Sequence, residues 1–80
     1  MDIGMLWFDN DPKLDLPGKV AKAAAYYQQK YGEEPTLCFV HPSMLAEQKV
    51  KAGGVAVCSN NTVQPNHFWI GVQQINNPSP

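Results

Sequence analysis

Residues 2–12 read DIGMLWFDNDP, and the fold that the sequence predicts follows from this stretch. An apolar run of strand length, Ile3 to Phe8, stops abruptly at the polar turn residues 9–12. A short apolar run closed by turn residues is typical of a strand buried on both faces. We therefore predict an interior strand here, with Leu6 and Phe8 pointing to the face opposite Trp7. Gly4 has no side chain, so a neighbouring group can approach the strand closely there.

A helix is predicted to follow this strand and to end at residue 31. Asp15 can cap its amino end, Pro17 suits its first turn, and Gly32 is a typical stop signal. Residues 19–31 are rich in alanine, lysine and glutamine, which favour helix. Apolar residues recur at helical spacing and form one stripe along the helix. The stripe consists of Val20, Ala23, Ala24, Tyr27 and Tyr31.

Three further strands are predicted, over residues 36–40, 55–58 and 67–72, with a short helix starting at Ser43 and ending near Gln48. The order β-α-β-(short α)-β-β predicts a small α/β domain with a four-stranded mixed sheet. The first two strands are joined by a helix, so we expect them to be parallel neighbours. The last two should form an antiparallel hairpin. We expect one domain over residues 1–73 and a flexible polar tail over residues 74–80.

Composition and charge limit the classes of function that the chain can have. The chain has 80 residues, a net charge of −1 and no arginine, its six basic residues all being lysine. Arginine is the usual reader of phosphate and guanine, so nucleic acid is a disfavoured partner. No run approaches the roughly 18 apolar residues that span a bilayer, and no basic signal-peptide region is present. We therefore expect a cytoplasmic protein with no membrane partner, no resident cofactor and reduced cysteines.

Polar residues follow each of the first two predicted strands. Asp9 and Asp11 come directly after the first strand, and His41 and Ser43 after the second. Because the carboxyl ends of neighbouring parallel strands meet at one sheet edge, these four side chains should converge. Oxygen ligands suit magnesium or calcium, and a helix start at Ser43 could receive phosphate. A divalent-metal or phosphate site is therefore one alternative, and a simple turn built by Asp, Asn and Pro is the other.

The strand followed by Asp9-Asn10-Asp11 resembles the first motif of haloacid-dehalogenase-type phosphotransferases. The resemblance implies that Asp9 is a nucleophile and Asp11 an acid–base. It also implies that Ser43 is the hydroxyl residue after the second strand. It covers about ten residues. Pro12 and Lys13 stand where the motif continues toward threonine or valine, and the family's later lysine and acidic pair are missing.

Two cysteines and two histidines offer a further alternative. Cys38, His41, Cys58 and His67 match the ligand count of a structural zinc site. Their spacing is poor, because positions three apart on a strand face opposite ways. A Cys-His nucleophile pair is also possible, although no local signature supports it. Small buried cysteines and structural histidines are the simpler interpretation.

The predicted strands carry more apolar surface than the helices can cover. One long and one short helix would cover a single face of a sheet that is apolar on both faces. Trp7 and Trp69 are then candidates for the uncovered face or its rim, and such surface is usually buried against a partner. With no complete catalytic motif, we predict a small non-enzymatic interaction or accessory domain that forms a homo-oligomer or binds a protein partner. A monomer whose second helix covers that face is the alternative.

Overall fold

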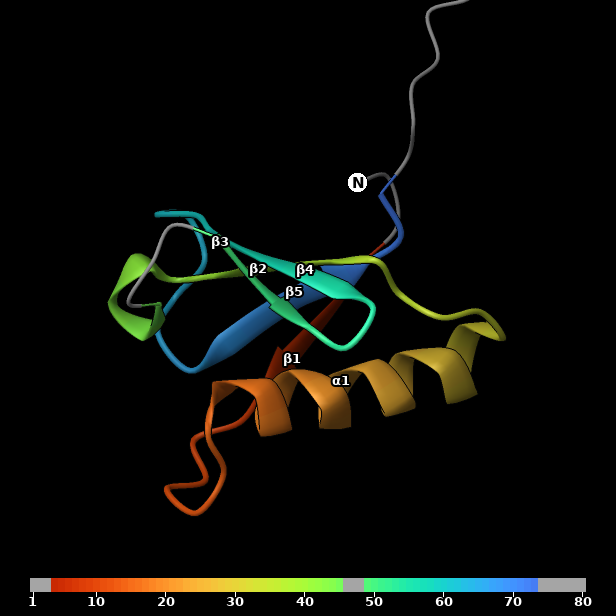
Figure 1. Cartoon of the computed structure of the whole chain (residues 1–80), viewed down its shortest axis with the longest axis horizontal. Coiled ribbons are helices and arrows are strands. Elements are labelled where there is room, and N and C mark those ends of the chain that lie inside the picture. Colours follow the sequence, from red (N-terminus) through yellow and green to blue (C-terminus); the bar gives the residue numbers. More distant parts are fainter. Residues whose placement is uncertain (1–3, 46–48, 74–80) are drawn as a thin grey trace, which may run out of the picture.

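The computed structural model describes residues 4–45 and 49–73, where one α-helix lies along one face of a five-stranded mixed sheet (Figure 1). The α/β class is as predicted, but the sheet has one strand more than expected. The elements are β1 (Gly4–Phe8), α1 (Leu16–Tyr31), β2 (Leu37–Val40), β3 (Lys49–Ala52), β4 (Val55–Ser59) and β5 (His67–Gly71), with a short 3-10 helix, η1 (Pro42–Met44), after β2.

The strand order is β1-β5-β2-β4-β3, which corrects the predicted topology. β1 and β2 are each antiparallel to β5, so they run in the same direction without touching. The predicted hairpin is also wrong, because β2 separates β4 from β5 and pairs with β4 in parallel. β2 is the central strand, with β5 between it and β1, and Phe68 and Ile70 of β5 are fully buried. The predicted interior position of the first strand is wrong, because β1 lies at the rim and leaves Leu6 60% and Phe8 56% exposed.

The predicted helix from Ser43 is replaced by η1 and by strand β3. His41 caps η1, because its Nδ1 accepts the N–H of Ser43 at 3.1 Å. β3 pairs with β4 through the two-residue turn Gly53-Gly54. Gly53 has a φ of +61°, which this tight turn favours in glycine. Part of the predicted helix, residues 46–48, lies outside the described residues, and so does the predicted tail over residues 74–80.

The long helix is confirmed together with both of its caps. Asp15 Oδ1 accepts the N–H of Gly18 at 2.9 Å. Gly32 adopts a left-handed φ of +78°, and its N–H donates to the carbonyl of Gln28 at 2.8 Å. Cap bonds of this kind satisfy backbone groups that have no partner inside the helix.

The core lies between α1 and one face of the sheet. The helix contributes the buried side chains of Val20, Ala23 and Tyr27. The strands contribute Cys38, Val40, Val55, Val57, Phe68 and Ile70. Because α1 covers only this face, the opposite face of the sheet is covered by no helix of the described chain (Figure 1).

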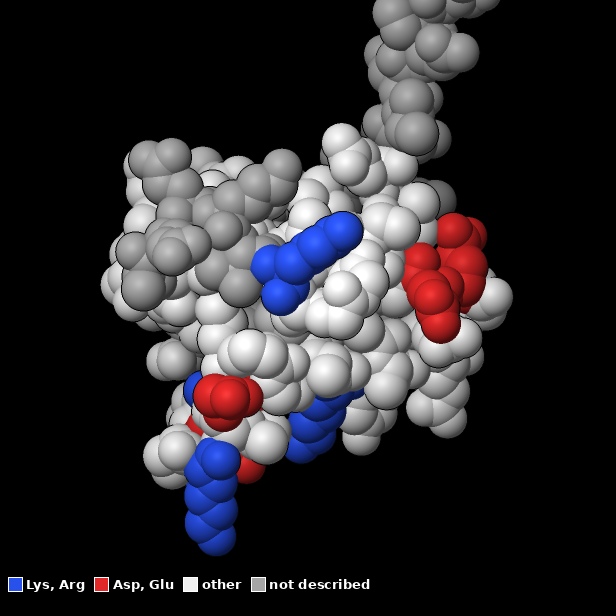
Figure 2. Space-filling model, viewed as in Figure 1, with Lys and Arg blue, Asp and Glu red and all other residues white. Residues whose placement is uncertain are grey.

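Charged side chains are dispersed over the face seen in Figure 2. Acidic side chains gather near the carboxyl end of α1, acidic and lysine side chains lie together near its amino end, and separate lysine side chains lie between, over β3 and β4 and along α1. This pattern differs from the single basic stripe that typifies nucleic-acid binding. No helix in residues 4–45 or 49–73 is both long and apolar enough to cross a membrane.

Candidate functional site

We call the face of the sheet opposite α1 the uncovered face. Every second residue along each strand directs its side chain to this face. Paired residues on neighbouring strands share a face, so Leu6, Trp69, Phe39 and Cys58 form one row across four strands. The side chains of this face belong to Leu6, Phe8, Leu37, Phe39, Lys51, Ala56, Cys58, His67 and Trp69. Most of them are apolar.

Four large side chains of this face form what we call the apolar patch: Leu6, Phe8, Phe39 and Trp69. Leu6 and Phe8 are the most exposed large hydrophobic side chains in the described chain, at 60% and 56%. The ring of Phe8 lies 5.1 Å from that of His67, measured between centroids. Exposed apolar side chains that are contiguous, rather than scattered singly, mark a surface for a partner.

The indole ring of Trp69 packs over Gly4, which has no side chain to exclude it. A Cβ atom at position 4 would lie 2.7 Å from two carbons of the indole, so the ring covers the glycine backbone. This confirms the close approach that was predicted at Gly4. The indole therefore spans from β5 onto β1 and links the two strands on the uncovered face.

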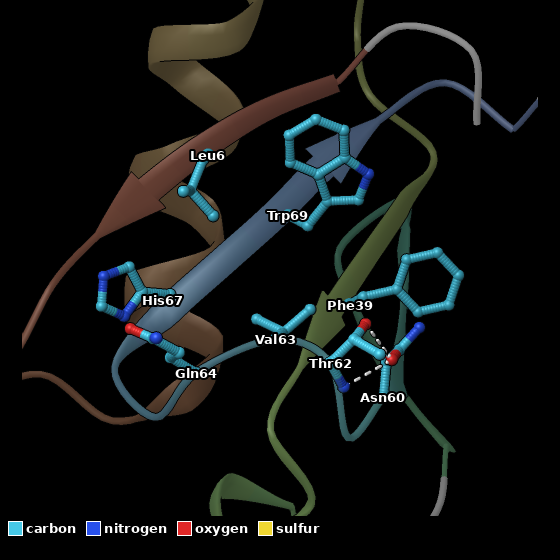
Figure 3. A pocket seen from close by; sticks show the side chains of 8 residues that line it. All are labelled: Leu6, Phe39, Asn60, Thr62, Val63, Gln64, His67 and Trp69. Carbon is cyan, nitrogen blue, oxygen red and sulfur yellow. Dashed lines mark hydrogen bonds between the residues drawn. The ribbon is translucent and has the colours of Figure 1, made fainter.

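A pocket of about 520 Å³ opens in the apolar patch (Figure 3). Leu6, Trp69 and Phe39 line it from three strands, and Val63 lines it from the loop after β4. Val63 is only 9% exposed, so this loop supplies an apolar wall of the pocket.

The loop after β4 also gives the pocket an uncharged polar rim. Asn60, Thr62 and Gln64 line this side. The backbone N–H and the hydroxyl of Thr62 donate to Oδ1 of Asn60 at 2.9 and 2.6 Å, and these bonds fix the loop (Figure 3). An apolar centre with a polar rim is the usual anatomy of a protein interface.

Trp7, the other candidate interface residue, lies on the covered face of the sheet. Its ring stacks on Tyr26 of α1, with centroids 4.5 Å apart and planes at 28°. Of the two tryptophans, only Trp69 lies on the uncovered face. The indole Nε1 of Trp7 is buried and has no hydrogen-bond partner among the described residues.

The predicted acidic pair forms successive turns after β1. Asp9 Oδ1 accepts the N–H of Asp11 at 2.9 Å, and Asp11 Oδ1 accepts the N–H of Lys13 at 2.9 Å. Asp9 is buried at 8% exposure, and its Oδ2 has no partner in the described chain. These bonds match the turn alternative, since aspartate side chains commonly bond the backbone two residues on.

His41 and Ser43 are brought together, but away from the acidic pair. His41 Nδ1 lies 2.8 Å from Ser43 Oγ. Asn66, the residue before β5, lies between the two groups: its carbonyl accepts the N–H of Asp9 at 2.9 Å, and its N–H donates to Met44 Sδ at 3.0 Å. The expected convergence depended on adjacent first and second strands, which the sheet does not have.

The two cysteines lie on neighbouring strands but on opposite faces of the sheet. Cys38 pairs with Val57 on the covered face, and Cys58 pairs with Phe39 on the uncovered face. One zinc ion would need both sulfur atoms on one side of the sheet. Both thiols are free, and no group of three or more His, Cys, Asp or Glu in residues 4–45 and 49–73 could hold a metal ion.

Burial raises the pKa of the Cys38 thiol to about 12, and the nearby Cys58 thiol adds to the shift. A thiol with so high a pKa is almost entirely protonated near neutral pH and is a poor nucleophile. His67 uses its Nδ1 in a 2.9 Å contact with the carbonyl of Pro65. Cys38 lies on the covered face and His67 on the uncovered face, so these two residues do not form a nucleophile pair.

Sequence reasoning did not single out Leu6, Phe8 and Phe39 as surface residues. The signal was present for β1, because alternation placed Leu6 and Phe8 opposite Trp7, and this alternation is confirmed. The alternation did not predict which of the two faces of the sheet the helix would cover.

Comparisons with known proteins add no family assignment. No protein-family model matches the chain, no curated protein matches its sequence, and no solved structure matches its fold. The resemblance of residues 9–11 to the phosphotransferase motif is therefore not accompanied by a family match.

Proposed function

We propose that this chain is a small non-enzymatic interaction module that associates through the apolar patch, in the first instance with a second copy of itself. The single observation that carries the proposal is the contiguous exposure of Leu6 and Phe8 beside Trp69, on a face without helix cover. Burying such side chains releases about 25 cal/mol per Å² of apolar surface, which favours association.

The surroundings of the apolar patch support this proposal. The loop at Asn60 and Thr62 provides hydrogen-bonding groups without charge, as the rim of an interface does. Lys51 is exposed at the far side of the face, two strands away from Phe39. No charged side chain of the described chain therefore interrupts the four residues of the patch.

The test is sedimentation velocity of the full chain over a wide concentration range. Wild-type protein should shift from monomer toward dimer as concentration rises. Leu6→Lys should remain monomeric over that range, because it places a charge in the middle of the patch. Since Leu6 is already 60% exposed, the variant should keep its fold, which circular dichroism can verify.

Tyr31→Lys is the matched control, because Tyr31 is an exposed aromatic residue on α1, at 39%, away from the patch. It should associate as the wild type does. A wild-type protein that stays monomeric at the highest concentration, or equal behaviour of the two lysine variants, would contradict the proposal.

A further inference from the structure

The edge of the sheet at β1 has backbone groups with no partner strand in the described chain. The Asp9 N–H donates to the Asn66 carbonyl at 2.9 Å, in the register of the β1–β5 ladder. Bonds of an antiparallel ladder alternate along a strand, so every second residue directs its N–H and C=O outward. The outward residues of β1 are Gly4, Leu6 and Phe8.

The two edge strands of the sheet, β1 and β3, differ in how well they are protected against pairing with a strand of another molecule. β3, at the far edge, contains the exposed Lys51, and lysine on an edge strand opposes pairing with another sheet. β1 contains neither a charged residue nor proline between Gly4 and Phe8. A molecule with one open edge forms a closed pair with its copy, whereas two open edges would allow filaments.

We propose that a second copy of this chain pairs with the first along β1, antiparallel and centred on Leu6. The inference rests on the proposed function: it keeps a second copy as the partner and narrows the contact to the part of the apolar patch beside the β1 edge, namely Leu6, Phe8 and Trp69. In this register Leu6 faces the second copy's Leu6, and Gly4 faces the second copy's Phe8. All outward backbone groups of β1 then find a partner, and a shift to any other centre leaves some of them unpaired.

Side chains on the uncovered face fit this register. Phe8 of each copy stands opposite Gly4 of the other, and the indole of Trp69 lies over that glycine. The Phe8 ring therefore meets an aromatic surface across the junction, a contact that stabilises cross-strand pairs. Leu6 meets its own copy at the two-fold axis, and no charged side chain is brought against its equivalent.

The pairing would join the two uncovered faces into one continuous surface. The two-fold axis stands perpendicular to the sheet, so both copies of α1 lie on the same side. Phe39 lies on β2, two strands from the junction, at a distance of roughly 10 Å. Phe39 therefore remains outside the contact in edge pairing, whereas face-to-face stacking of two uncovered faces would bury it. A substitution of Phe39 can thus distinguish the two modes of association.

Single cysteines at two positions of β1 test the register. In a Cys58→Ser background, Leu6→Cys places two thiols at a paired position, with Cα atoms about 5.5 Å apart, which a disulfide can bridge. Phe8→Cys is the matched control, since it is equally exposed on the same face of the same strand. In this register its two copies lie about 14 Å apart, too far for a disulfide.

We expect Leu6→Cys to form covalent dimers in oxidised glutathione several-fold faster than Phe8→Cys. We also expect Phe39→Lys to dimerise as the wild type does. Equal cross-linking of the two cysteine variants, or loss of the dimer in Phe39→Lys, would overturn edge pairing while leaving association through the patch intact. A wild-type protein that is monomeric at every concentration would overturn both proposals.

Discussion

The indole ring of Trp69 occupies the space that a side chain at Gly4 would need. A Cβ atom there would lie 2.7 Å from Cε2 and Cζ2 of the ring. Trp69 stands directly opposite Leu6 in the β1–β5 ladder, so its ring leans diagonally along β1. This contact ties the edge strand β1 to its neighbour β5 and shapes one side of the pocket on the uncovered face.

Gly4→Ala should therefore destabilise the protein by about 1–3 kcal/mol, the usual cost of overpacking. Urea unfolding measures the change. Gly54→Ala is the control, because nothing lies within 4 Å of a Cβ at that position, and its effect should stay within about 0.5 kcal/mol. In a Trp69→Leu background, Gly4→Ala should cost much less. An equal cost in both backgrounds would show that the clash is not with the indole.

Asp15→Ala should destabilise the protein by about 0.5–2 kcal/mol, because the N–H of Gly18 loses its acceptor at the start of α1. Asp15→Ser should retain most of the stability, since a hydroxyl can replace the carboxylate as a cap. Thermal unfolding followed by circular dichroism compares the variants, with Lys22→Ala on the exposed side of α1 as the control. If serine and alanine are equally destabilising, the cap does not stabilise the helix.

The two cysteines should differ sharply in reactivity. Cys58 is partly exposed on the uncovered face, whereas Cys38 is fully buried and its pKa is raised to about 12. A disulfide reagent such as 5,5′-dithiobis(2-nitrobenzoate) should rapidly label one thiol in native protein and two in urea. Cys58→Ser should show no rapid labelling until it is unfolded. Rapid labelling of that native variant would mean that Cys38 is accessible.

Stability should fall at alkaline pH, partly because of Cys38. Its pKa rises from the ordinary value of 9.0 to about 12 in the fold, first through burial and then through the Cys58 thiol. Below pH 9 both the folded and the unfolded thiol are protonated, and the contribution is fully present. Between pH 9 and 12 only the unfolded chain releases this proton, so the free energy of unfolding decreases as pH rises.

Cys38→Val should flatten this alkaline decline while filling the same buried site. Urea midpoints at pH 8, 9 and 10 provide the measurement, and other titrating groups contribute equally to both proteins. Cys58→Ser should keep nearly the wild-type slope, because it leaves the burial of Cys38 unchanged. Parallel slopes for wild type and Cys38→Val would contradict the assigned role.

Local features of this fold could be predicted from neighbouring residues. The helix, its cap at Asp15 and its stop at Gly32 depend on side chains within a few positions of one another, so their signals are legible in the sequence. Alternation likewise placed Leu6 and Phe8 opposite Trp7. The β3–β4 hairpin also has a local signal, the Gly53-Gly54 pair, but the apolar residues before this pair predict a helix instead.

The α/β class, the long helix with its caps and most of the strands follow from local propensity and periodicity, so they can be predicted from the order of residues alone. The position of β5 between β1 and β2, which separates Asp9 from His41 and leaves β1 at the rim, depends on contacts between distant segments. The same arrangement places Cys38 and Cys58 on opposite faces and turns Trp7 toward α1. Packing between distant segments determines which strands are neighbours. The two-residue period of a strand shows which side chains share a face, but it does not show which strand pairs with it.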